Sequence, residues 1–88
     1  MSSVDVKAAT TAAFTYFKDV YAPNLPDNIR IEEVWLSDDE ENWHITLGYD
    51  LPASSQALAI LQPPVREYKE FVVRASDGRV VAMRIRKP

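Results

Sequence analysis

The sequence lacks the residues that most catalytic and metal-binding chemistries require. Its 88 residues include no cysteine, two glycines and one histidine, His44. Without cysteine there can be no disulfide framework, thiolate zinc site or cysteine nucleophile, and one histidine excludes any site that needs two. Gly48 and Gly78 are too few for a glycine-rich phosphate-binding loop. We therefore expect no metal and no cofactor.

Long apolar runs are also missing. No stretch approaches the roughly 18 apolar residues of a membrane-spanning helix, and the N-terminus does not have the basic-then-apolar pattern of a secretion signal. Hydrophobic residues make up 47% and charged residues 26%, which is average for a globular protein. A chain this short holds one modest core. We expect a single domain over residues 1–88, soluble and cytoplasmic, with no membrane partner.

Charge is divided unevenly along the chain, whose formal net charge is −3. Residues 1–50 carry three basic and ten acidic side chains, whereas residues 51–88 carry seven basic and three acidic ones. The isoelectric point near 5.0 argues against non-specific nucleic-acid binding, which relies on clustered lysine and arginine. We therefore expect no nucleic-acid partner. The opposite charges of the two halves predict that their strands pair across a sheet.

The first twenty residues have the apolar spacing of an amphipathic helix. Ser2 or Ser3 is the expected N-cap, and Asp5 is favourable near the positive end of the helix dipole. Pro23 should end the helix, because the residue before a proline is kept out of helical angles. We expect a helix over about residues 4–21. Its apolar face has residues three and four positions apart: Val6, Ala9, Ala13, Phe17 and Val20, flanked by Phe14 and Tyr21.

Beyond residue 28 the apolar period changes to two, which is typical of strands. The polar segment Ser37–Glu41 and the turn at Asp77-Gly78 each predict a hairpin. In the first run Ile29, Ile31 and Trp35 share one phase, whereas Val34 and Leu36 have the opposite phase. This predicts either a bulge near Glu32-Glu33 or a strand whose two faces are both partly covered. Four runs are rich in branched and aromatic residues: Ile29–Leu36, Trp43–Tyr49, Tyr68–Ala75 and Val80–Arg86.

Residues 52–64 allow two interpretations. Ala53–Leu61 could form two turns of helix that press on the sheet edge, with Ser54 or Ser55 as the cap. Pro63-Pro64 would forbid any helix beyond this point. The segment could equally be a long mobile loop, and both alternatives stay open.

These elements predict an α+β fold, with one N-terminal helix packed on a four-stranded antiparallel sheet made of two hairpins. The helix should cover one face of the sheet, and the residues expected to be buried are Phe14, Phe17, Trp43, Ile45, Leu47, Val81, Met83 and Ile85. The other face should show His44, Thr46, Ala82 and Arg84, with Val34, Leu36, Tyr68, Val72 or Val80 added according to register. An exposed face as apolar as this would be a docking surface or a dimer interface.

The same layout resembles two groups of known domains. A sheet wrapped around one helix is similar to the cystatin-like folds. The closing run Phe71–Val81 resembles the end of PepSY-type domains, and the alternation of Trp43, Ile45 and Leu47 resembles their second strand. Together with Ile31–Val34, these features are also similar to a set of short, uncharacterised bacterial α+β proteins. The resemblance implies a fold and transfers no catalytic residue.

Two candidate sites contain ionisable side chains. His44 could act as a general base if Glu32 or Glu33 stood beside it across the sheet, although a lone histidine on the polar face of a strand is usually a surface residue. The acidic hairpin could hold a hard cation, but it lacks the glycine and the ligand spacing of an EF-hand and is more typical of a solvated turn. Its four acids are Asp38, Asp39, Glu40 and Glu41.

Two functional hypotheses follow. The first is a non-enzymatic module, monomeric or homodimeric, that binds or inhibits another protein with a basic surface, as immunity-type and propeptide-like inhibitors do. Its partner-binding residues would be Asp38, Asp39, Glu40, Glu41, His44 and Arg84. The second is a small cystatin-like ligand-binding or catalytic domain with a pocket between helix and sheet. The first is favoured, because a pocket would consume much of the only core. We therefore expect a protein that is not an enzyme.

Overall fold

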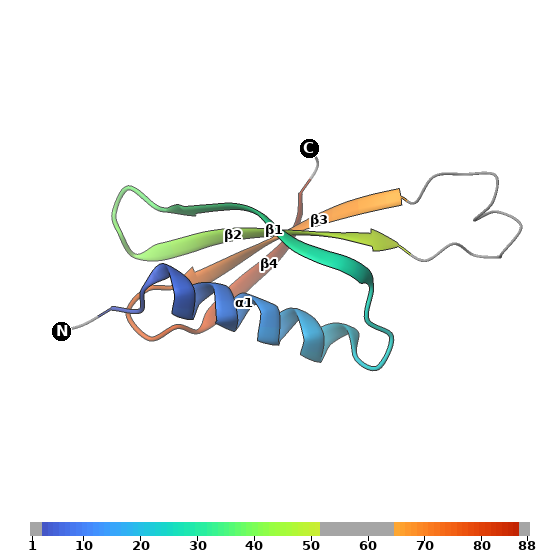
Figure 1. Cartoon of the computed structure of the whole chain (residues 1–88). Coiled ribbons are helices and arrows are strands. Elements are labelled where there is room, and N and C mark those ends of the chain that lie inside the picture. Colours follow the sequence, from blue (N-terminus) through green and yellow to red (C-terminus); the bar gives the residue numbers. More distant parts are fainter. Residues whose placement is uncertain (1–2, 52–64, 87–88) are drawn as a thin grey trace, which may run out of the picture.

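A computed structural model describes residues 3–51 and 65–86 as one helix followed by four strands. The strands pair antiparallel in the order β1-β2-β3-β4, and the helix lies along one face of the sheet (Figure 1). The predicted α+β architecture is therefore confirmed, while the possible helix at residues 53–61 lies outside the described residues. The elements are α1 (Val6–Tyr21), β1 (Asp27–Leu36), β2 (Asn42–Leu51), β3 (Val65–Arg74) and β4 (Val80–Arg86).

The start of α1 is capped and then attached to the sheet. Asp5 is the N-cap, in place of the expected Ser2 or Ser3, and its carboxylate accepts a hydrogen bond from the Ala8 N–H at 2.8 Å. Just before it, the backbone of Val4 donates to the carbonyl of Ala75 at 2.7 Å. No helix in the described part of the chain is long and apolar enough to cross a membrane.

The core lies between α1 and the two central strands. Phe17 is fully buried, and its ring centroid lies 5.0 Å from that of Tyr49 and 6.0 Å from that of Phe71. Ala9 and Ala13 are also fully buried, and such small side chains let the helix backbone approach the sheet. The remaining buried members of this cluster are Ile45, Leu47 and Val73.

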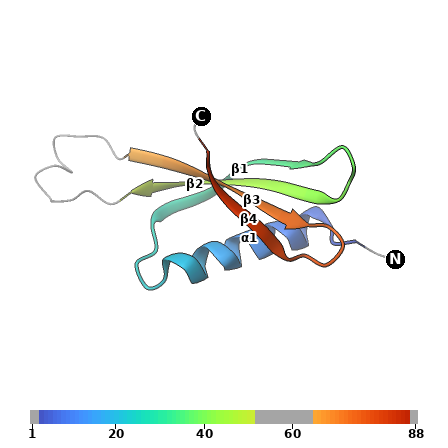
Figure 2. The ribbon, with the colours of Figure 1, turned by 180° about the vertical axis from the view of Figure 1, so that it is seen from behind.

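Two residues predicted to be buried are exposed. Val81 is 51% exposed and Ile85 is 75% exposed, because one helix is about 10 Å wide and strands are about 4.8 Å apart, so α1 covers little more than two strands. The helix lies over β2 and β3 and leaves much of β4 uncovered (Figure 2). Phe14, Trp43 and Met83 are partly buried at the margin of the core.

The phase change in β1 comes from its pairing with β2, whose register shifts twice, between Asp27 and Arg30 and between Ile31 and Glu33. The bulge alternative is therefore confirmed. Beyond the second shift, Trp35 lies opposite His44 on the open face of the sheet. The register and the packing then divide the five apolar candidates for this face: Tyr68 and Val72 lie on it, whereas Val34, Leu36 and Val80 lie on the helix side.

Candidate functional site

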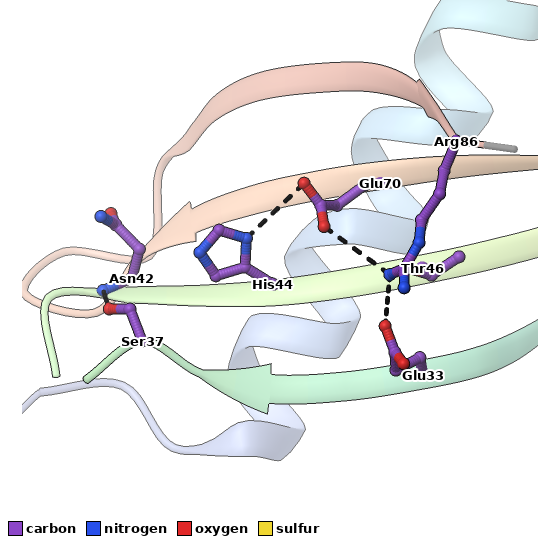
Figure 3. Close-up of polar contacts among 7 residues, drawn as sticks. All are labelled: Glu33, Ser37, Asn42, His44, Thr46, Glu70 and Arg86. Atoms are coloured by element: carbon purple, nitrogen blue, oxygen red, sulfur yellow. Dashed lines mark hydrogen bonds and ion pairs between the residues drawn. The ribbon is translucent and has the colours of Figure 1, made fainter.

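The open face of the sheet carries a network of charged and polar side chains, rather than the apolar patch that the sequence predicts. Arg86 of β4 is at its centre and extends across the face (Figure 3). Its Nη1 donates hydrogen bonds to the carboxylate of Glu33 on β1 and, at 2.9 Å, to the hydroxyl of Thr46 on β2. The same nitrogen lies 3.7 Å from Oε2 of Glu70 on β3. One arginine therefore links all four strands.

His44 lies beside this network and is partly buried. Its Nδ1 is 3.6 Å from Oε1 of Glu70, too long for a hydrogen bond, and has no hydrogen-bond partner among the described residues. The carboxylate beside His44 is thus that of Glu70, and not of Glu32 or Glu33. Since neither a carboxylate nor a carbonyl in the described part of the chain orients this ring, its geometry gives no support to general-base catalysis.

Trp35 covers the other side of the His44 ring. The two rings are parallel within 7°, with centroids 4.0 Å apart. Trp35 remains 43% exposed, so the outer face of its indole is available to solvent. The signal of this position in the sequence was the bulge alternative near Glu32-Glu33, since a register shift there moves Trp35 to the face opposite Ile31. We call Trp35 and His44 the aromatic platform.

A second charged cluster lies toward the opposite end of the same face. The guanidinium of Arg66 bridges Glu32 and Asp50, at 3.0 Å from each. A hydrogen bond from Asn28, together with Arg66, holds the pKa of the Asp50 carboxyl below its usual range. Gly48 lies beneath this bridge and leaves room for it. A Cβ at this position would lie only 2.9 Å from the Glu32 side chain. The single positive charge of Arg66 is therefore fully engaged by two carboxylates, and the three side chains together carry a net charge of −1.

The acidic hairpin between β1 and β2 uses one of its carboxylates to hold its own shape. Asp39 accepts hydrogen bonds from the Ser37 hydroxyl at 2.5 Å and the Glu41 N–H at 3.0 Å, and these lower the pKa of Asp39. Asp38, Glu40 and Glu41 are exposed. The turn is thus shaped by Asp39, while the other three acids face solvent.

The structure brings some of the predicted partner-binding residues together and leaves one apart. The acidic hairpin follows β1 directly and leads into β2, so it adjoins the aromatic platform. Arg84 is exposed on β4, opposite Glu70 in register, and the whole of β3 separates it from His44. Asp38–Glu41 and His44 therefore belong to one surface and Arg84 to another. Within the described residues no three His, Asp or Glu side chains group as metal ligands would.

No protein-family model, curated protein or solved structure matches this chain. The resemblance to PepSY-type and cystatin-like domains therefore stays a prediction.

Proposed function

We propose that this protein is a non-enzymatic binding module that docks a basic segment of another protein on the aromatic platform and the acidic hairpin. The observation that carries this proposal is the exposed indole of Trp35, stacked at 4.0 Å on His44 and adjoining the acids of the hairpin. Tryptophan is among the residues that contribute most to protein–protein affinity.

The stacking prepares Trp35 for binding. An indole held parallel to a neighbouring ring loses little conformational entropy when a partner covers its outer face. That face attracts an arginine or lysine side chain through cation–π interaction, worth about 0.5–2 kcal/mol. The platform therefore suits a basic residue better than an apolar or acidic one.

The hairpin supplies the charge that such a partner requires. Asp38, Glu40 and Glu41 are exposed and lie within one four-residue segment. Their combined field would steer a basic partner toward the platform, and the association rate would fall as salt increases. Arg66 and Arg86 are engaged with carboxylates of the sheet face, so they do not cancel the charge of the hairpin.

The alternative, a ligand pocket between helix and sheet, has less support. Phe17, Tyr49 and Phe71 fill the space between α1 and the central strands. His44 and Tyr49 lie at even and odd positions of β2 and therefore on opposite faces of the sheet, so they cannot line one cavity. The described residues thus favour a surface-binding function over a pocket.

The test is affinity capture from native lysate, with quantitation of every captured protein. We expect the parent chain to capture a protein with a basic surface. The amount of that protein captured should fall at least about tenfold with Asp38→Lys/Glu40→Lys and with Trp35→Ala. Asp19→Lys/Asp27→Lys is the matched control, because it changes net charge equally at exposed positions away from the hairpin. Capture that survives both site variants, or that the control abolishes equally, would show the proposal to be wrong.

A further inference from the structure

The outer edge of β4 is a regular strand edge from Ala82 to Arg86, beyond a register shift between Val80 and Ala82 at the start of the strand. Within residues 3–51 and 65–86, no strand pairs with the side of β4 that faces away from β3. From Ala82 to Arg86 the pairing with β3 has no register shift, so alternate N–H and C=O groups along this run point outward. The other edge strand, β1, is interrupted by two register shifts. β4 is therefore the edge to which a further strand can add.

The helix side of this edge is apolar. Ile85 and Val81 are the exposed aliphatic residues of β4, at 75% and 51%. Across from the start of the strand, Tyr16 of α1 is also exposed and lines a shallow, open groove with Val80. Val20 lies one helical turn beyond Tyr16 and is exposed as well. An added strand could place apolar side chains along this border.

The opposite side of the same edge is basic. Residues 78–86 contain three arginines, Arg79, Arg84 and Arg86, and no acid. Arg84 is exposed and makes no ion pair with the residues that the structure describes. Arg84 and Arg86 both lie on the open face, as their register with Glu70 and Tyr68 shows. Arg86 pairs with Glu33 and lies near Glu70, so Arg84 carries the positive charge at the edge of this strand. A strand beside β4 would therefore meet positive charge on this face.

We propose that β4 binds an extended acidic segment of a partner protein as a fifth strand of the sheet. The segment alternates apolar and acidic residues, because neighbouring strands match their side chains face by face. Its carboxylates lie beside Arg84, and its apolar side chains lie beside Ile85 and the helix border. Main-chain hydrogen bonds provide affinity, and the two faces provide specificity.

A second copy of the chain fits this edge less well. Antiparallel pairing of two β4 strands would bring arginines of like charge together on the same face, which is destabilising. The acidic strand β1 of another copy offers Glu32 and Glu33, but its two register shifts interrupt the ladder that β4 would need. An acidic peptide from a different protein meets neither obstacle.

The probe is a fluorescent heptapeptide of alternating glutamate and valine, and the readouts are fluorescence anisotropy and amide NMR shifts of the intact chain. We expect a dissociation constant below about 1 mM, with the amide shift changes concentrated on β4. A peptide with lysine in place of glutamate should bind at least about tenfold more weakly. Two peptides N-methylated at alternate residues, one at the odd positions and one at the even positions, should differ. Only one of these two sets of N–H groups faces β4, so methylation of that set should abolish binding and methylation of the other should spare it.

Arg84→Glu should lower the affinity for the glutamate peptide by at least about tenfold. Lys7→Glu is the control, because it makes an equal charge change at an exposed position of the helix, and it should leave the affinity unchanged. Several results would overturn the proposal. They are no binding at about 1 mM, equal binding of the lysine peptide, equal binding of the two N-methylated peptides, no effect of Arg84→Glu, and self-association of the chain that protects the β4 amides.

Discussion

Trp35 and His44 face each other across β1 and β2 as two parallel rings, 4.0 Å apart and inclined by only 7°. The pair depends on the register shift between Ile31 and Glu33, which turns Trp35 away from the helix and onto the open face. A tryptophan that sequence periodicity would place at the core thus becomes part of the exposed surface.

The first prediction concerns this pair. We expect Trp35→Ala and His44→Ala to be non-additive in their effect on the free energy of unfolding, with a coupling of about 0.5–1.5 kcal/mol. Urea denaturation of both single variants and the double variant measures the coupling. The pair Trp35→Ala/Ile85→Ala is the control, and it should be additive because Ile85 lies on β4 at the far edge of the sheet. A Trp35–His44 coupling near zero would mean that the stacking contributes nothing.

The second prediction concerns the core. Phe17→Ala should reduce the free energy of unfolding by about 3–5 kcal/mol, because Phe17 is fully buried against Tyr49 and Phe71. Val20→Ala, on the same helix but half exposed, should cost well under half as much. Thermal and chemical denaturation compare the two. Similar losses in both variants would contradict the placement of the helix.

The third prediction concerns alkaline pH. Burial, hydrogen bonding to Tyr21 and the nearby Glu67 raise the pKa of the Tyr49 hydroxyl. Since the folded pKa is above the unfolded value of about 10, unfolding releases a proton above that pH, and stability should fall as pH rises. Tyr49→Phe should make this decline shallower while costing about 0.5–1.5 kcal/mol at neutral pH. Denaturation curves between about pH 8 and 11 test it. An unchanged slope would refute the assignment to Tyr49.

The fourth prediction concerns acid pH and the β3–β4 turn. Hydrogen bonds from Arg74 and from the Arg79 N–H lower the pKa of Asp77 to about 2. Because the folded pKa lies below the unfolded one, the stabilisation is present above about pH 4 and is lost as pH falls toward 2. Asp77→Asn should therefore be less stable than the parent at pH 7, with the two curves converging at low pH. Arg74→Gln should reduce the same pH dependence, and parallel curves at all pH values would be the contrary result.

The fifth prediction concerns metals. We expect melting curves of the protein with and without a chelator to overlay, because one histidine and scattered carboxylates make a poor transition-metal site. Calorimetry before and after dialysis against EDTA makes the comparison. A large destabilisation by the chelator would identify a structural metal and would require a different account of the site.

The sequence by itself determined the elements of this fold. Apolar spacing of three and four set α1, spacing of two set the strands, and the Asp77-Gly78 turn joined β3 to β4. These patterns are local, because side-chain direction within a helix or strand follows from backbone geometry alone. The alternation in β2 therefore correctly placed Ile45 and Leu47 in the core.

Only the tertiary structure decided which of the alternating apolar residues are buried and which charged side chains form pairs. Periodicity gives Val81 and Ile85 the pattern of buried residues, but the width of one helix leaves them exposed. Arg86 and Glu33 are 53 residues apart in the chain and lie on the two edge strands, and they pair because the long Arg86 side chain extends across the open face of the sheet (Figure 3). Which side chains are buried and which contacts form across strands depend on how the helix and strands are placed relative to one another. No local pattern in the sequence contains that information.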